Sequence, residues 1–365
     1  MIKPMLRSLF ICHFLVLSYS HTCAQSDLRQ TITDLMARAE VPGLSLALIH
    51  DGEIAVLPFG VKRAGADEPV SIETRFEAAS LTKPVFAYAV LRLVDQGVLD
   101  LDTPLDKYWL SSEVNTAEWP GVITARMVLT HTTGLPNWRR PRDAGQVMVQ
   151  YEPGSRYSYS GDGFVWLSRV LEHLTGKKTH VYIQEQVFEP LGLQHSSLVW
   201  TDEIAADCAS PHDVTGQPAD KYRPDAANAA ASLHTTAGDY AKFMVALSRG
   251  DGLSAESHRL MTSAQQFLDP TCSQCRHENA HPDFRDVSWA LGIGIEKGTE
   301  DYLWHWGDNG NFKAYVCYGL RTNTGLVYFA NGHGGLALRD ALVQAILPGE
   351  HPAHEWVIYP QMTAK

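Results

Sequence analysis

Two apolar runs joined by an Asp-Gly pair decide the fold at the start of the chain: Gly43-Leu-Ser-Leu-Ala-Leu-Ile-His50 and Glu53-Ile-Ala-Val-Leu57. Alternation and β-branched residues in the first run predict a strand, and Asp51-Gly52 is typical of a tight hairpin turn. Upstream, apolar residues recur at helical spacing over residues 27–39. The chain therefore begins with a helix followed by two antiparallel strands.

Short strands return near the other end of the chain. Turn residues separate four apolar runs, 289–296, 302–306, 312–320 and 325–330, and Asn323-Thr-Gly325 is typical of a hairpin turn. Residues 336–347 predict a closing helix. We expect an α+β sandwich in which one antiparallel sheet is built from both chain ends and flanked by the terminal helices.

The middle of the chain has a different character. Apolar periodicity predicts helices over 85–97, 166–174 and 181–187, and Thr236-Ala-Gly-Asp239 is a capping box that opens another over 240–248. Residues 196–232 show no clear periodicity. The stretch of about 99–247 is therefore interpreted as a mainly helical insertion beside the sheet.

Composition limits the classes of function. The chain has 365 residues, of which 45% are hydrophobic and 19% charged, which excludes a disordered chain, a collagen-like repeat and a bundle of membrane helices. Its 30 basic and 41 acidic residues give a net charge of −11. An acidic chain without a basic block is poorly suited to binding nucleic acid.

The first 24 residues resemble a secretory signal peptide. Lys3 and Arg7 precede a short apolar run, and Thr22-Cys-Ala24 offers a cleavage site before Gln25. The alternative is a membrane anchor, for which the run is short. We expect an exported protein, periplasmic or secreted, with one catalytic domain over 25–350, a tail over 351–365 and no stable membrane span after processing.

Four cysteines follow that segment: Cys208, Cys272, Cys275 and Cys317. In an oxidising compartment they allow three disulfide pairings or plain thiols. A zinc site at Cys272-Ser-Gln-Cys275, with His277 and His281 nearby, is the less favoured alternative.

Three short segments carry residues suited to hydrolysis. Ser80 and Lys83 lie one helical turn apart at the start of an apolar helix, where the lysine can activate the hydroxyl. The alternative is an N-cap serine with a solvated lysine. Tyr159, in a loop rich in Gly and Ser, presents a phenol or simply packs. His305-Trp-Gly307 ends a strand, and its glycine can allow close approach of a substrate or mark a turn.

Together these segments resemble the serine hydrolases related to class C β-lactamases, D-alanyl-D-alanine carboxypeptidases and esterases of the same fold. Ser80-Leu-Thr-Lys83 resembles the SxxK motif, and His305-Trp-Gly307 resembles the third motif, where KTG or HTG stands. The other matching segments are Leu129-Thr-His-Thr-Thr-Gly-Leu-Pro136, Pro153-Gly154, Tyr157-Ser-Tyr-Ser160 and Ala231-Ser-Leu-His-Thr-Thr-Ala-Gly-Asp239. The matches keep the family's order from about residue 43 to residue 330.

The resemblance implies a covalent mechanism without a metal or organic cofactor. Ser80 would attack a carbonyl, and Tyr159, with Lys83 beside it, would take and return the proton. The backbone N–H groups of Ser80 and Asp308 would hold the oxyanion. His305, Trp306, Gly307 and Gly161 would line the substrate cleft, in which Lys83 is one of few cations that the sequence identifies.

Two departures from the family pattern bear on the substrate. Gly161 stands where the family often has an asparagine, and His305 replaces the lysine of KTG. Both changes remove groups that bind substrate, so an esterase or D-amino-acid peptidase is favoured over an efficient β-lactamase, with a small molecule or cell-wall peptide as partner. The alternatives are a catalytically weak or inactive cell-wall peptide-binding module and, more remotely, a zinc hydrolase.

Overall fold

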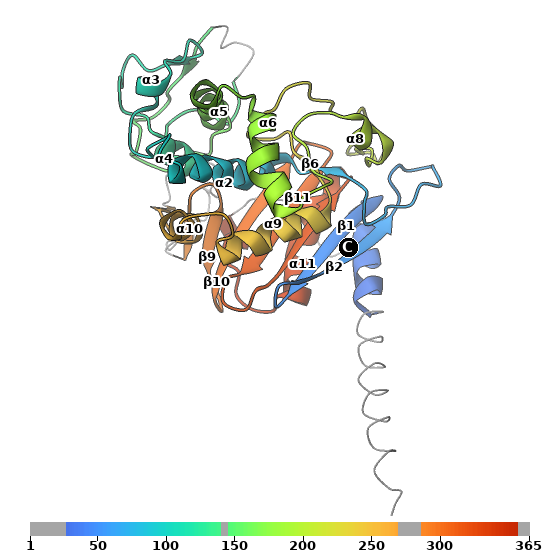
Figure 1. The fold of residues 1–365 in the computed structure, drawn as a ribbon. Coiled ribbons are helices and arrows are strands. Elements are labelled where there is room, and N and C mark those ends of the chain that lie inside the picture. Colours follow the sequence, from blue (N-terminus) through green and yellow to red (C-terminus); the bar gives the residue numbers. More distant parts are fainter. Residues whose placement is uncertain (1–26, 140–144, 269–285, 357–365) are drawn as a thin grey trace, which may run out of the picture.

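An eight-stranded antiparallel sheet forms the centre of the molecule (Figure 1). The computed structural model describes residues 27–139, 145–268 and 286–356. Strand β1 (Gly43–His50) pairs with β12 (Thr324–Ala330), so the two ends of the chain meet inside one sheet, as the sequence predicts. The order is β2-β1-β12-β11-β10-β9-β8-β7.

A tight turn joins β1 to its neighbour in the sheet, β2. Asp51 and Gly52 turn β1 into its neighbour with φ values of 50° and 78°, which suits an Asp-Gly turn. The other sheet strands are β2 (Glu53–Gly60), β7 (Gln266–Phe267), β8 (Val287–Trp289), β9 (Gly294–Lys297), β10 (Asp301–Asp308) and β11 (Lys313–Gly319). Two-residue pairs lie outside it: β3 (Phe76–Glu77) with β6 (His234–Thr235), and β4 (Val114–Asn115) with β5 (Val147–Met148).

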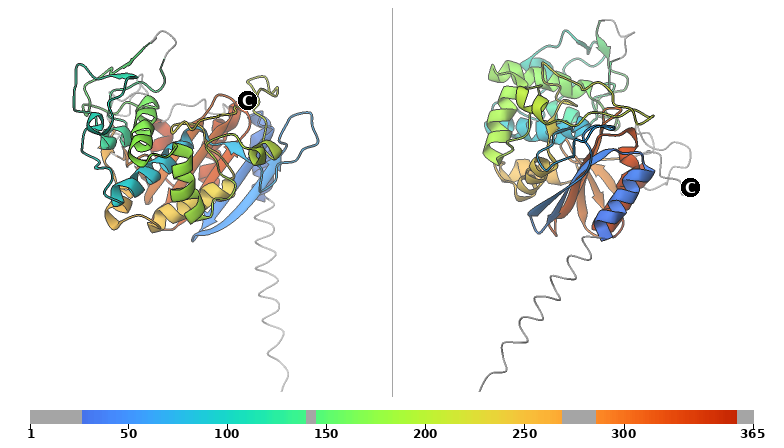
Figure 2. Two further views of the ribbon diagram at one scale, coloured as in Figure 1. Left: turned by 45° about the horizontal axis from the view of Figure 1, so that its top comes forward. Right: turned by 90° about the vertical axis from the view of Figure 1, so that its right-hand side faces the viewer.

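Helices cover both faces of the sheet (Figure 2). The face that carries the inserted helical block includes α2 (Thr82–Asp95), α5 (Asp162–Thr175) and α9 (Ala237–Arg249), while residues 27–38 and α11 (Arg339–Ile346) cover the other. As predicted, the Thr236 side chain caps α9 by accepting from the backbone N–H of Asp239. The shorter helices are α3 (Leu105–Tyr108), α4 (Ala125–Leu129), α6 (Thr179–Ile183), α7 (Glu189–Leu191), α8 (Asp202–Ala206), α10 (Ala255–Thr262) and α12 (Ala353–Trp356).

Three predicted elements are divided in the structure. The run 289–296 is two strands, β8 and β9, because Gly292 turns the chain with a φ of 81° and the N–H of Ala290 bonds to the carbonyl of Ile293. The closing helix begins as a 3-10 segment (His333–Leu338) before α11. The π-helical segment Gln184–Phe188 similarly continues α6.

Residues 351–356, which the sequence groups with a C-terminal tail, pack into the core. Trp356 is fully buried, with its ring 5.6 Å from that of Trp304 and 5.9 Å from that of Trp306. Cys208 and Cys317 are buried free thiols. The predicted signal peptide and the Cys272–Cys275 pair, with His277 and His281, lie outside the described residues.

Across the three described ranges, no helix combines the length and apolar character needed to cross a bilayer.

Candidate functional site

Ser80 stands in a tight turn between β3 and α2. The 3-10 turn Ala79–Leu81 precedes the helix, and Ala79 adopts a left-handed φ of 49°, which a residue with a Cβ rarely does. Thr82 holds this conformation, because its hydroxyl donates to the carbonyl of Ala79 at 2.6 Å and accepts from the N–H of Leu233 at 3.0 Å. The turn leaves Ser80 9% exposed at the start of α2.

Lys83 lies beside Ser80 and is fully buried. Its Nζ is 3.0 Å from Ser80 Oγ and donates to the carbonyl of Ala230 at 2.9 Å. Burial lowers the pKa of Lys83 well below its ordinary value, since the charged ammonium is poorly solvated there. The arrangement therefore favours a neutral amine within reach of a hydroxyl proton.

The side chain of Tyr159 lies beside those of Ser80 and Lys83. It hydrogen-bonds with the Ser80 side chain, and its ring centroid is 4.7 Å from Lys83 Nζ. Burial raises the pKa of Tyr159 and the bond to Ser80 offsets this only in part, so the phenol keeps its proton. Of the two bases considered from the sequence, Lys83 and Tyr159, the lysine is shifted toward its neutral form by burial, whereas the phenol is shifted away from the phenolate.

His131 holds the Tyr159 loop in place, a role that the sequence reasoning missed. Its carbonyl accepts from the N–H of Ser158 at 2.6 Å and its Nδ1 accepts from the N–H of Ser160 at 3.0 Å. Its ring lies 4.3 Å from the ring of Tyr159. The segment 129–136, matched as a motif, is therefore the support on which the tyrosine rests.

Gly307 lets the end of β10 lie against the turn that carries Ser80. A Cβ added at Gly307 would stand 2.4 Å from the carbonyl oxygen of Ala78 and 3.2 Å from the Cβ of Ala79. The expected close approach therefore exists, but the partner is the chain itself. Asp308 follows at the strand end, and its carboxylate pairs with the buried Lys313, a cation that the sequence reasoning also missed.

His305 and Trp306 lie behind Tyr159 instead of lining an open cleft. They are 0% and 3% exposed, and the Trp306 ring is 5.0 Å from that of Tyr159. Burial and the nearby Lys83 lower the pKa of His305 to about 3, so its imidazole is neutral. Both side chains are buried because β10 is covered on both faces over residues 302–307.

Glu77 links the two segments that meet at Gly307. Its carboxylate accepts from the Asn309 amide at 2.9 Å, and the same amide donates to the carbonyl of Ala231 at 3.3 Å. Burial raises the pKa of Glu77 to about 7. In the sequence, only the position of Glu77 three residues before Ser80 could have suggested that it lies near the site.

One group of potential metal ligands occurs among the described residues, away from Ser80. Glu296, Cys317 and His351 are buried between the sheet and the chain end. His351 Nδ1 lies 2.9 Å from Glu296 Oε1. Although burial opposes it, the bond to Glu296 and the charge of that carboxylate raise the pKa of His351. The hydrogen bond between His351 and Glu296 accounts for the pairing of these two side chains.

Comparison with known proteins agrees with the motifs. A family model described as Beta-lactamase matches residues 28–348. Penicillin-binding protein 4 of Amycolatopsis lactamdurans is 27% identical over 253 residues, which cover 64% of this chain and 66% of that protein. A beta-lactamase of Yersinia enterocolitica is 23% identical over 270 residues, covering 72% and 67%. The chain thus spans about two thirds of the length of these curated relatives.

A solved structure shares the architecture. The D-alanine carboxypeptidase AmpC from Burkholderia cenocepacia superposes with a TM-score of 0.72 at 20% identity, covering 90% of this chain and 99% of that one. This likeness confirms the predicted β-lactamase/transpeptidase-like fold. Because the family model covers most of the chain and its motifs meet around Ser80, the protein belongs to the Beta-lactamase family.

Proposed function

We propose that the protein is an exported serine hydrolase that cleaves an ester or amide through an acyl-enzyme on Ser80. The observation that carries the proposal is the buried lysine whose Nζ is 3.0 Å from Ser80 Oγ. A neutral amine at this distance is a base for the hydroxyl proton, which a solvated lysine is not at neutral pH. The leader-like N-terminal sequence supports export.

Acylation uses Lys83 and Tyr159 in sequence. Lys83 Nζ accepts the Ser80 proton while Oγ forms a bond to the substrate carbonyl carbon. Collapse of the tetrahedral intermediate breaks the bond to the leaving group, which departs with the phenolic proton of Tyr159. The lysine then returns its proton to the tyrosine. The contact between Gly307 and the Ser80 turn supports the backbone N–H groups of Ser80 and Asp308 as the oxyanion site.

Deacylation repeats the transfer with water. Lys83 accepts a proton from water as the water oxygen bonds to the acyl carbon, and the same proton restores the Ser80 hydroxyl when the acyl bond breaks. Because the lysine starts and ends neutral, each half-reaction balances without a metal or organic cofactor.

The substrate class follows from two groups that the site lacks. Gly161 offers no side-chain amide, and the neutral His305 offers no cation for a substrate carboxylate. Penicillin binding and β-lactam hydrolysis, named for the relatives, depend on recognising an anionic ligand. An ester, or a D-amino-acid peptide that is recognised without its terminal carboxylate, including one derived from the cell wall, is therefore the favoured substrate.

The experiment compares wild type with Ser80→Ala on p-nitrophenyl acetate and a chromogenic cephalosporin. We expect ester turnover that exceeds cephalosporin turnover and falls by about 1,000-fold or more in Ser80→Ala. Ser112→Ala, which removes the hydroxyl of an exposed serine, is the matched control. Undiminished turnover by Ser80→Ala would contradict the assignment.

A peptide-binding module without turnover is the second candidate, favoured by Gly161. It predicts that wild type binds D-alanyl-D-alanine peptides but releases no product from any ester or amide tested. The close contact of Ser80, Lys83 and Tyr159 favours the enzyme, since binding alone does not require a buried lysine.

A further inference from the structure

The loop that carries Asn137 and Trp138 fills the space next to Gly161. Its N–H donates to the carbonyl of Asn137 at 3.0 Å. A Cβ added at Gly161 would meet that oxygen at 2.5 Å and the Trp138 ring atoms Cζ3 and Cη2 at 3.0 and 3.1 Å. The space that a side chain at position 161 would enter is therefore occupied by the indole of Trp138.

Trp138 differs from the other aromatic rings around Lys83. Its ring centroid is 5.9 Å from Lys83 Nζ, close to the distance of Phe164 at 5.7 Å. Phe164 and Tyr159 are buried, whereas Trp138 is 43% exposed. Part of this apolar side chain is thus open to solvent, and its ring lies 5.9 Å from the lysine nitrogen that is itself 3.0 Å from Ser80 Oγ.

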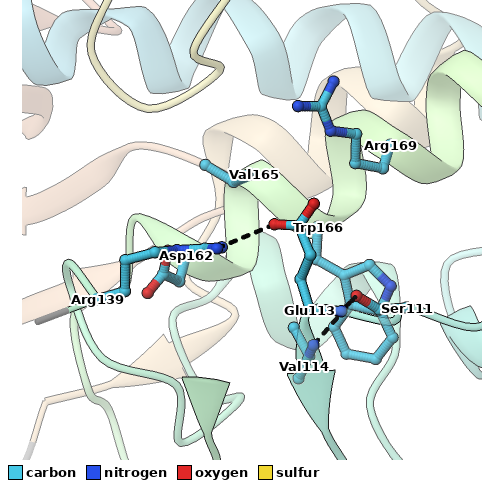
Figure 3. A pocket seen from close by; sticks show the side chains of 8 residues that line it. All are labelled: Ser111, Glu113, Val114, Arg139, Asp162, Val165, Trp166 and Arg169. Atoms are coloured by element: carbon cyan, nitrogen blue, oxygen red, sulfur yellow. Dashed lines mark hydrogen bonds and ion pairs between the residues drawn. The ribbon is translucent and has the colours of Figure 1, made fainter. Parts of the chain in front are cut away.

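Two ion pairs fix this loop on the rest of the molecule (Figure 3). Arg139 Nη1 lies 3.0 Å from Glu113 Oε2, and its Nε lies 3.3 Å from Oδ1 of the buried Asp162, which directly follows Gly161. Figure 3 shows Arg139 reaching across the start of α5 toward both carboxylates. The backbone next to Trp138 is therefore tied to Glu113 and to the start of α5, and a restrained wall loses less entropy when a ligand binds.

We infer that Trp138 forms the wall of an acyl-binding subsite that selects substrates with an uncharged, apolar and preferably aromatic acyl group. This inference rests on the proposed function and names its substrate class. An indole face binds apolar and aromatic groups, and the one hydrogen-bond donor of the ring, Nε1–H, lies at its edge and not on its face. Among the described residues near the trio and the indole, burial lowers the pKa of Lys83 and His305. Lys313 is paired with Asp308, and Arg139 is paired with Glu113 and Asp162, so an acyl carboxylate would find no unpaired cation among these residues.

The test uses two esters with one leaving group. Wild type, Trp138→Ala and Trp138→Phe are assayed on p-nitrophenyl phenylacetate and p-nitrophenyl acetate, and the ratio of their kcat/KM values is compared. We expect wild type to prefer the phenylacetyl ester and Trp138→Ala to reduce the ratio about tenfold or more, as removal of apolar contacts typically does. Trp138→Phe keeps an aromatic wall and should retain most of the ratio.

Leu110→Ala is the matched control, because it also removes an exposed apolar side chain, 71% exposed, but lies outside the site. Its ratio should equal that of wild type. A ratio unchanged in Trp138→Ala, with hydrolysis still dependent on Ser80, overturns the subsite and leaves the hydrolase standing. Failure of wild type to hydrolyse either ester overturns both proposals. Thermal unfolding of each variant verifies that the chain is folded.

Discussion

Burial of Lys83 would supply the base of the proposed reaction, and it lowers the stability of the folded chain. Its pKa is held well below the value of an unfolded lysine. Between the folded and unfolded pKa values the unfolded chain binds a proton that the folded chain does not, so the free energy of unfolding falls as the pH falls through that range. Activity and stability therefore make opposite demands on this residue.

Lys83→Met separates the two demands. We expect kcat/KM for an ester to fall by about 100-fold or more, because the general base is lost. The melting temperature should rise at neutral pH, since an apolar chain of similar length needs no desolvation of an ammonium. Differential scanning calorimetry measures the second effect. A lower melting temperature would show that the bonds of Nζ to Ser80 and Ala230 outweigh its burial.

Glu77→Gln tests how the free energy of unfolding depends on pH through a single buried carboxyl group. The pKa of Glu77 is raised from 4.5 to about 7, so the folded chain keeps a proton that the unfolded chain releases between these values. The free energy of unfolding should fall by up to about 3 kcal/mol as the pH rises from 4.5 to 7. Urea unfolding across this range should show a flatter dependence in Glu77→Gln, whose side chain does not titrate. Identical profiles would contradict the burial of an ionisable Glu77.

At the scale of elements, the site depends on how closely β10 approaches the turn before α2. Gly307→Ala would place a methyl group 2.4 Å from the carbonyl oxygen of Ala78. The strand must then move away from the Ser80 turn, and we expect kcat for an ester to fall by about tenfold or more, as loss of an oxyanion donor does.

Gly238→Ala is the control for this prediction. Gly238 lies in α9, and an added Cβ would approach the Val56 side chain at 3.3 Å and the Thr236 hydroxyl at 3.8 Å, with no backbone atom of another described segment so close. Its activity should remain close to that of wild type. Unchanged kcat in Gly307→Ala would indicate that the approach of β10 does not shape the site.

Sequence patterns predicted the helices and strands better than they predicted the contacts between them. Alternation of apolar residues and the Asp51-Gly52 turn were sufficient to predict β1 and β2. The proximity of Ser80 and Lys83 could be predicted because the two residues lie one helical turn apart. The turn within residues 289–296 was not predicted. An apolar stretch has the same sequence pattern whether the strand continues or reverses direction at Gly292. Contacts such as Gly307 with Ala78, or Glu77 with Asn309, join distant segments, and no local pattern records them.

At the scale of the whole molecule, the segment that ends the described residues at Trp356 closes the core beneath the site. Trp356 from the C-terminal segment packs against Trp304 and Trp306 of β10, and Trp306 in turn packs against Tyr159. The aromatic cluster therefore connects the chain end to the proposed proton donor.

Trp356→Ala should lower the free energy of unfolding by about 3–5 kcal/mol, as expected for a large cavity in a core. Denaturant unfolding monitored by circular dichroism measures the change, and Trp356→Phe should recover much of it. A cost below about 1 kcal/mol would place this residue outside the cooperative core.

The central claim is the acyl-enzyme on Ser80, and mass spectrometry tests it most directly. Wild type and Ser80→Ala are mixed with a p-nitrophenyl ester, quenched with acid during turnover, and analysed as intact proteins and as peptides. The account predicts one added acyl group on the peptide that carries Ser80 in wild type and none in Ser80→Ala. An acyl group on another residue, or turnover by Ser80→Ala at the wild-type rate, would contradict it.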